Sequence, residues 1–306
     1  MNDIVKLNYL ENQVLNNIAN SKAGNTLRAY KSDFQDFKNF CLKYNFSDLP
    51  SSPKIVGIYL NDLSSRFKFS TIKRRLASIN CVHRLKGHYL DCSHPLIKEN
   101  LIGIKRNIGI NQKSKKPLLY NNLINIINLI NKDIEYNFLQ KKRDKAILLI
   151  GFSGGFRRSE LSSLNPEDIE FVEEGVKITI KKSKTDQYGK GFQKGIPYFR
   201  NKSYCPVIAL KEWLKIRIEH ERKKTLFQCS DRTIALIIKK YTSSAGLDSN
   251  QYSGHSLRSG FATSTAALGV DERSIMSMTG HKSSEMVRRY IKESNLFKNN
   301  ALNALK

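Results

Sequence analysis

Hydrophobic residues in the first third of the chain recur every three or four positions, which is the spacing of amphipathic helices. Four stretches show this pattern: residues 26–44, 55–67, 70–85 and 96–106. Pro50 and Pro53 separate the first two stretches, since proline interrupts a helix or begins one. The pattern therefore predicts a helical domain over residues 1–106.

The pattern changes after this domain. Residues 107–117 (NIGINQKSKKP) are polar and basic without periodicity, which predicts a linker. Residues 118–134 and 141–150 again predict helices, and the chain is helical from Pro206 onward. Between them, three short stretches predict strands joined by turns: residues 169–171, 176–180 and 192–198. The predicted fold is mainly α with a small antiparallel β-sheet, and the second domain covers residues 118–306.

The charge of the chain suggests a partner. Its 306 residues include 52 Lys and Arg against 27 Asp and Glu, a formal net charge of +25, and the excess is present in both halves. Nucleic acid is the first candidate, an anionic membrane surface the second, and a merely solvated surface the alternative. No apolar run approaches the roughly 20 residues of a membrane span, and we recognise no signal peptide. The five scattered cysteines are typical of reduced thiols, so we expect a cytoplasmic protein, bacterial or phage-derived and associated with the nucleoid.

Basic residues gather on the helix predicted over residues 70–85. We interpret five of them as candidate DNA-binding residues, although solvated basic faces are also common: Lys73, Arg74, Arg75, Arg84 and Lys86. A cluster of Cys and His residues follows on the same segment: Cys81, His83, His88, Cys92 and His94. Their spacing does not form the two ligand pairs of a structural zinc site, so we predict no metal here.

Four segments of the second half contain residues suited to stabilising a phosphate. They are GGFRRSEL (residues 154–161), SKTD (183–186), HSLR (255–258) and GH (280–281), the last of which precedes Tyr290 by nine positions. His255 and Arg258 stand three positions apart, which places them on one face of a helix. Any single segment is more often structural, but four in this order are difficult to attribute to chance.

Together these segments resemble the tyrosine-type site-specific recombinases, the phage-integrase and Cre-like family. GFRRSEL matches the first arginine box and assigns it to Arg157, while HSLR, TGH and MVRRYI match the boxes of the family's later histidines, arginine and tyrosine. The resemblance implies six catalytic residues: Arg157, Lys184, His255, Arg258, His281 and Tyr290. The lysine assignment stays open, because Lys182 and Lys190 are close to Lys184.

The resemblance also implies the fold and the reaction. It implies a helical core-binding domain and an α+β catalytic domain, which would close on duplex DNA and cleave and rejoin it through a 3′-phosphotyrosyl intermediate. The resemblance implies no cofactor, metal or ATP. It also implies self-association into a tetramer in the synaptic complex. The final residues, SNLFKNNALNALK, would then dock on a neighbouring subunit, with a self-packed or frayed terminus as the alternative.

These residue types suit the chemistry on physical grounds. Guanidinium groups can each bind two non-bridging oxygens of a phosphate as negative charge develops on them. A tyrosine phenol, with a pKa near 10, needs a proton acceptor such as His255, and the departing oxygen needs a proton that a lysine can supply. His281 can donate to a phosphate oxygen. Glu160 stands three positions after Arg157 and can orient its guanidinium.

Two other functions remain open at this point. One is a catalytically silent DNA-binding protein, although decay usually removes a catalytic residue and all are present here. The other is a type IB topoisomerase, which by resemblance shares the same chemistry. The helical first half and the spacing of HSLR, TGH and Tyr290 favour the recombinase.

Overall fold

A computed structural model of the chain describes residues 21–109, 114–133, 137–181, 191–217, 225–281 and 283–295, with a few isolated positions near each end. The chain divides into two compact units, Met1–Lys113 and Ser114–Lys306. Each unit has its own hydrophobic core. The described structure is mainly helical with one three-stranded antiparallel sheet, which confirms the predicted fold class.

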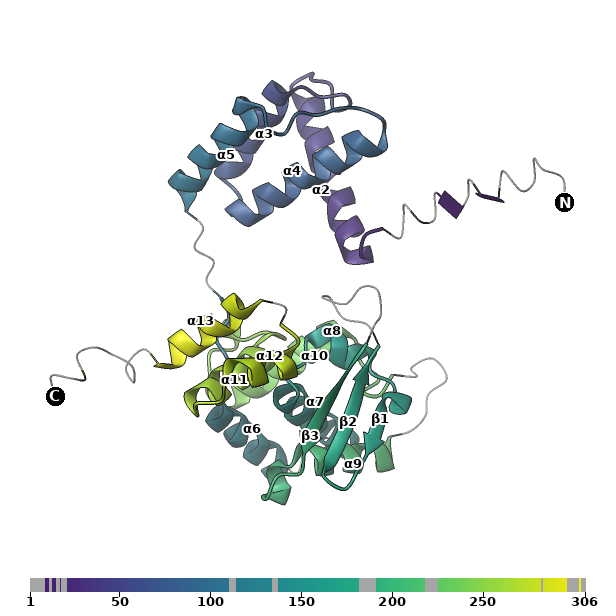
Figure 1. Cartoon of the computed structure of the whole chain (residues 1–306), viewed down its shortest axis with the longest axis vertical. Coiled ribbons are helices and arrows are strands. Elements are labelled where there is room, and N and C mark those ends of the chain that lie inside the picture. The colour runs from purple at the N-terminus through teal and green to yellow at the C-terminus, as the bar shows by residue number, and fades with distance from the viewer. Residues whose placement is uncertain are drawn as a thin grey trace. The chain divides into compact units, whose positions relative to one another are not determined.

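Over residues 21–109, the first unit contains four helices (Figure 1): α2 (Gly24–Lys43), α3 (Pro53–Ser64), α4 (Phe69–Leu85) and α5 (Pro95–Ile108). α2 packs on α4 and α3 packs on α5, and the apolar faces of all four enclose one core. Ser52 caps α3 through its side chain and a proline begins both α3 and α5, as is common at helix N-termini. Each helix was predicted from periodicity alone, within about three residues at its ends.

The second unit begins with α6 (Tyr120–Lys132), α7 (Phe138–Ser153) and the short α8 (Arg158–Ser163). The sheet follows, with strand order β1 (Ile169–Phe171), β2 (Gly175–Ile180) and β3 (Phe192–Pro197) and both pairs antiparallel. The remaining helices are α9 (Pro206–Ile216), α10 (Asp231–Ser244), α11 (Ser256–Ala267), α12 (Glu272–Thr279) and α13 (Ser284–Asn295). Short 3-10 turns span Pro166–Asp168, Lys202–Tyr204 and Ser249–Gln251.

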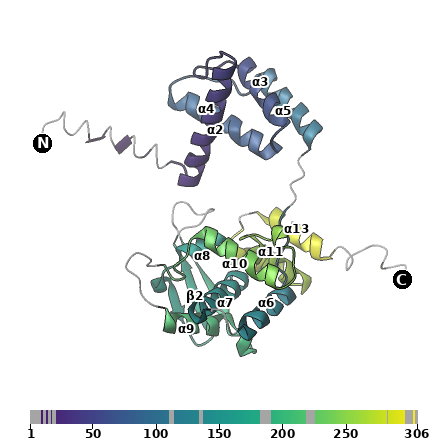
Figure 2. The same cartoon turned by 180° about the vertical axis from the view of Figure 1, so that it is seen from behind.

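The centre of this unit is α7, whose last eight residues are all buried. The sheet lies on one side of the unit, and α11, α12 and α13 lie on the other (Figures 1 and 2). A smaller apolar cluster, which includes Ile275, Val287 and Tyr290, joins these last three helices. The candidate site residues come from the strand β3, from the turns and helix ends between the sheet and this cluster, and, for Tyr290, from the cluster itself.

The stretch predicted as a linker, residues 107–117, contains the boundary between the units. Its two ends belong to the units themselves. α5 continues through Ile108, and the backbone N–H of Lys116 donates to the carbonyl of Gln251. Leu118 continues this contact by donating to Ser256, and a Cβ on Gly260 would lie 1.9 Å from the Leu118 carbonyl oxygen. Only glycine therefore lets the entering chain lie this close to α11.

Candidate active site

The turn that joins α7 to α8 positions the first arginine. Gly155 has a positive φ of 55°, which glycine adopts readily, and the fully buried Phe156 anchors the turn in the core. Arg157 then caps the N-terminus of α8. Its backbone N–H donates to Oε2 of Glu160 (2.9 Å) and its Nη1 donates to Oε1 (2.6 Å). The buried Glu160 carboxylate thus holds both the backbone and the side chain of Arg157.

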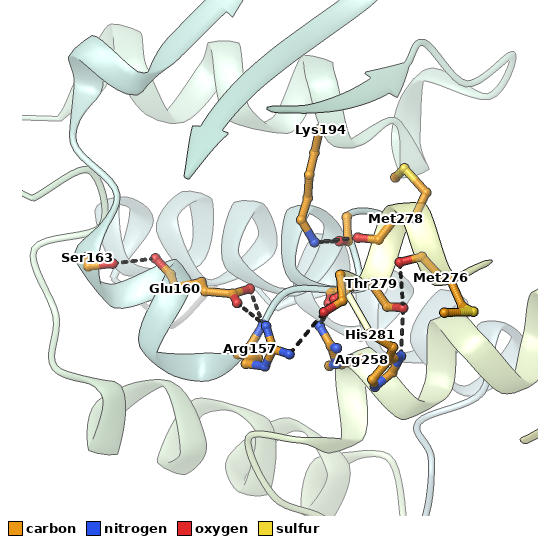
Figure 3. Close-up of polar contacts among 12 residues, drawn as sticks. Arg157, Glu160, Ser163, Lys194, Arg258, Met276, Met278, Thr279 and His281 are labelled. Atoms are coloured by element: carbon orange, nitrogen blue, oxygen red, sulfur yellow. Dashed lines mark hydrogen bonds and ion pairs between the residues drawn. The ribbon is translucent and has the colours of Figure 1, made fainter. Parts of the chain in front are cut away.

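The neighbouring Arg158 lies outside this arrangement. Its guanidinium forms an ion pair of 3.0 Å with Asp231 at the start of α10. Arg157 instead turns toward the end of α12, where its Nη2 donates to the carbonyl oxygen of Gly280 at 3.3 Å (Figure 3). Of the two consecutive arginines, the structure therefore brings Arg157 into the cluster.

Arg258 on α11 is completely buried. Its Nη1 donates to the carbonyl of Gly155 (3.0 Å) and to that of Thr279, so it bridges the same two backbone segments (Figure 3). Among the described residues, its Nε and Nη2 find no hydrogen-bond acceptor. Burial and the adjacent charge of Arg157 lower the pKa of Arg258 to about 10. Buried donors without acceptors are costly and rare, and they favour an anionic ligand.

His281 comes two residues after the end of α12, and the intervening C-cap residue, Gly280, is in the left-handed conformation (φ 64°). Its Nδ1 lies 2.7 Å from the hydroxyl of Thr279. Burial lowers the pKa of His281 to about 3, with repulsion from Arg258 and Arg157 as the next causes. The ring is therefore neutral at physiological pH in the protein without a bound anion.

Tyr290 lies on α13, and the residue is 8% exposed. Nε2 of His255, the N-cap residue of α11, is 3.3 Å from the Tyr290 hydroxyl, and the ring centroid of His281 is 6.3 Å from that of Tyr290. Packing of Tyr290 with Val287 and Ile275 orients α13 so that the hydroxyl faces the cation cluster. The structure thus brings together five of the six sequence-predicted catalytic residues: Arg157, His255, Arg258, His281 and Tyr290.

The sixth, Lys184, lies outside the described residues, as do Lys182 and Lys190. They belong to the connection between β2 and β3. The final segment predicted to dock on a neighbouring subunit, with Phe297, Leu302 and Leu305, also lies outside the described residues.

Sequence reasoning missed a lysine inside the site. Lys194 on β3 is 1% exposed, and its ammonium donates to the carbonyls of Gly154 and Met278 (Figure 3). Its Nζ also lies 4.5 Å from the ring centroid of Phe156. Burial lowers its pKa, Glu160 opposes this effect, and Arg258 and Arg157 add to it, so that the pKa is about 7. The alternation of side chains along β3 could have revealed that Lys194 is buried, because Lys194 lies on the same face of the strand as the inward-facing Ile196.

In the first unit, one of the five candidate DNA-binding residues is not on the surface. Arg75 is 8% exposed and is ion-paired with Asp36, while its guanidinium lies over the ring of Phe67. The reason is its position, three residues after Ile72 and four before Ile79, both fully buried. The helical period thus places Arg75 inside the apolar stripe, so its assignment to the basic face was mistaken. The other four side chains are exposed: Lys73, Arg74, Arg84 and Lys86.

The Cys and His segment that superficially suggested a metal site has a different structural role. His83 is fully buried, and its Nε2 accepts from the backbone N–H of Ser51 (3.0 Å) while its Nδ1 contacts the carbonyl of Ile79 (2.9 Å). His94 instead accepts from the N–H of Leu96 at the start of α5. Within the described part of the chain, no group of three or more His, Cys, Asp or Glu side chains could hold a metal ion. None of its helices is long and apolar enough to cross a membrane.

Comparison with known proteins identifies the family. The model of the phage integrase family matches residues 120–296. A Selenomonas ruminantium protein named integrase/recombinase XerD homolog is 40% identical over 93% of this chain and 86% of its own length. The tyrosine recombinase XerC of Thermodesulfovibrio yellowstonii is 28% identical over 92% of this chain and 90% of its own.

Solved structures show the same fold. The XerH site-specific recombinase, bound to a palindromic difH substrate in a post-cleavage complex, matches with a TM-score of 0.60 and 20% identity over 82% of this chain and 73% of that one. A lambda integrase (75–356) dimer bound to a COC′ core site matches with a TM-score of 0.57 and 16% identity, over 93% of this chain and 94% of that one. The chain therefore belongs to the phage integrase family and is a site-specific tyrosine recombinase that cleaves and rejoins DNA.

Proposed function

We propose that the second unit binds the scissile phosphate of duplex DNA between Arg157, Arg258 and His281, and that Tyr290 attacks it. The observation that carries this proposal is Arg258, whose buried Nε and Nη2 lack acceptors among the described residues. The non-bridging oxygens of a phosphodiester would satisfy those donors. Burial and the neighbouring positive charges lower the pKa of Arg258 and of His281, and the charge of the phosphate would offset the effect of those positive charges.

The proposed reaction begins at the phenol. His255, 3.3 Å from the hydroxyl, accepts the proton as the Tyr290 oxygen attacks phosphorus. The bond from phosphorus to the 5′ oxygen breaks, and Lys184 supplies the proton that this oxygen needs. The DNA is then joined to the enzyme as a 3′-phosphotyrosine. The 3′-phosphotyrosine is itself a phosphodiester, so it keeps the energy of the bond that was broken. A 5′ hydroxyl of the partner duplex can therefore attack it and rejoin the strand without ATP.

Charge on the phosphate oxygens increases as the attack proceeds. The two guanidiniums are already held in place by Glu160 and by backbone carbonyls, so they need little reorganisation when that charge develops. Preorganised donors of this kind contribute roughly 3 kcal/mol each to stabilising a transition state. Glu160 acts on the reaction only through Arg157 and is proposed as a positioning residue.

DNA binding by the first unit is proposed for the exposed cations of α4. Lys73 and Arg84 are eleven positions apart, which is about three helical turns, so they lie on one face of the helix. Arg74 is partly neutralised by Asp33 at 2.8 Å, which makes it the weaker candidate. The overall charge of +25 supports a phosphate-binding surface on both units.

Assembly and location are part of the proposal. The lambda integrase structure contains a DNA-bound dimer. We extend this to a tetramer when two duplexes exchange strands, since each of the four cleaved strands requires its own tyrosine. We also place the protein in the cytoplasm, where a bacterial chromosome or plasmid is accessible to it.

The experiment uses a nicked duplex that traps the covalent adduct. A target is first selected from a randomised duplex pool by binding to the Tyr290→Phe protein, which binds without cleaving. The wild-type chain is expected to form an adduct that survives denaturing electrophoresis. The Tyr290→Phe protein should form none while still shifting the duplex on a native gel. The control is Tyr198→Phe, which removes the hydroxyl of a partly exposed tyrosine of the same unit and should leave the adduct unchanged.

The results separate the three functions. Adduct formation by the Tyr290→Phe protein would refute the assignment of the nucleophile. Sequence-specific binding without an adduct from the wild-type chain would indicate a silent DNA-binding protein. Relaxation of a supercoiled plasmid that lacks the selected site would indicate a topoisomerase.

A further inference from the structure

Thr279, the last residue of α12, connects the backbone of that helix to His281. Its side chain is fully buried. The hydroxyl oxygen lies 2.6 Å from the carbonyl oxygen of Ile275 and 2.7 Å from Nδ1 of His281. The His281 contact is drawn in Figure 3, together with a longer one of 3.5 Å to the carbonyl of Met276. The two shorter contacts have the length of good hydrogen bonds to a hydroxyl group.

The protons in this chain of contacts can be assigned by elimination. A carbonyl oxygen only accepts, and two oxygens 2.6 Å apart require a proton between them, so the Thr279 hydroxyl donates to Ile275. Having one proton, the hydroxyl can only accept from His281. Nδ1 of His281 must therefore carry a hydrogen. In the neutral ring, Nε2 is then an acceptor and has no hydrogen to donate.

We propose that Thr279 is a positioning residue that fixes His281 in the Nδ1-protonated tautomer, so that His281 donates to a phosphate oxygen only after taking up a second proton. The donation from His281 to a phosphate oxygen rests on the proposed function, since it assumes that the scissile phosphate lies beside His281. The tautomer itself follows from the contacts of Thr279 alone.

The surroundings of the ring make the second proton depend on the phosphate. Among the described residues, the titratable groups that face it are Arg157 before α8, His255 and Arg258 at the start of α11, and Lys194 on β3, together with the phenol of Tyr290. The first four oppose protonation of His281, and the carboxylate of Glu160 is already engaged by Arg157. A bound phosphodiester adds the missing negative charge and raises the pKa of His281. Engagement of the scissile phosphate is thus coupled to proton uptake.

The first test reads the tautomer directly in the DNA-free protein at neutral pH. Long-range ¹H–¹⁵N correlation spectra are expected to show a protonated Nδ1 and an unprotonated Nε2 for His281, whose signals are assigned with His281→Gln. Thr279→Ser keeps the hydroxyl and should keep the tautomer. Thr279→Val is nearly isosteric but cannot accept, so the Nε2-protonated form should appear. An Nε2-protonated ring in the wild-type chain would overturn the proposal whether or not Tyr290 is the nucleophile.

The second test measures proton uptake when DNA binds. Each chain carries Tyr290→Phe to prevent cleavage and is titrated with the selected duplex in two buffers of different ionisation enthalpy. Other groups, Lys194 among them, contribute equally in every chain, so only the difference between variants is interpreted. Uptake should be lower for Thr279→Val than for Thr279→Ser by up to about one proton, because the freed neutral ring can donate from Nε2. Equal uptake by the two variants would overturn the proposed coupling.

The two tests also separate this inference from the proposed function. If Tyr290→Phe still formed an adduct, the nucleophile would be wrong while the tautomer result stood. The thermal unfolding temperature of each variant shows whether Thr279→Val remains folded, and Thr279→Ser keeps the tautomer assignment testable if it does not.

Discussion

Replacing Lys194 with methionine should change the stability of the second unit in a pH-dependent way. The substitution keeps an unbranched chain of similar length and removes the ammonium that donates to Gly154 and Met278. The buried carbonyl of Gly154 and the half-buried carbonyl of Met278 then lose a donor, which costs up to about 1–3 kcal/mol each. Against this loss, the folded protein no longer has to bury a charge beside Arg157 and Arg258.

The magnitude follows from the pKa of Lys194, which folding lowers from 10.5 to about 7. The unfolded chain therefore binds the proton more tightly, and the wild-type protein gains stability as the pH rises from about 7 toward 10.5. Between pH values of about 6 and 9, the gain amounts to roughly 3 kcal/mol. Lys194→Met lacks this titration, so the free energy of unfolding of the wild type relative to the variant should rise by that amount.

Urea unfolding followed by tryptophan fluorescence measures this difference. Trp213 is the only tryptophan of the chain and is buried in the second unit, so the signal reports the unit that holds Lys194. The control is Lys177→Met. Lys177 lies on the neighbouring strand opposite Gly195, but its side chain is exposed, so its removal should not produce this pH dependence. A difference between wild type and Lys194→Met that stays constant with pH would refute the buried-charge argument.

Three further predictions concern single side chains. Glu160→Gln leaves Arg157 without its carboxylate partner, so adduct formation should slow by about tenfold to a hundredfold while binding persists; an unchanged single-turnover rate would contradict this. Arg75→Met should leave the salt dependence of DNA binding unchanged, whereas Arg84→Ala should reduce the slope of log K against log salt by about 1; equal slopes for both variants would remove Arg84 from the interface. Gly155→Ala should destabilise the second unit by about 1–3 kcal/mol in urea unfolding, because φ is positive there and the added Cβ would lie 2.9 Å from a neighbouring methyl group; wild-type stability would show that the turn relaxes freely.

The helices and strands could be predicted because their signals are local. The apolar positions of α4 and the alternation of β2 and β3 are readable within single windows of the sequence. The motif residues were also recognisable, because the spacing within HSLR and around TGH is a property of the chain. Arg75 shows the limit of this reasoning: its charge suggested the surface, while its helical position and the carboxylates of α2 placed it inside.

The sequence by itself determined the fold class, the family and the residue types that phosphate chemistry needs. Only the tertiary structure decided which of these residues lie together in the candidate active site. Arg258 and Lys194 come from separate elements, and each donates to a carbonyl of the Gly154–Gly155 turn and to a carbonyl at the end of α12. Arg157, at the start of a third element, donates to the carbonyl of Gly280, which directly follows α12. The physical reason is that the protonation of these groups depends on how deeply they are buried and on how close the cations lie to one another. Both depend on distances between segments far apart in the chain. No local pattern encodes those distances.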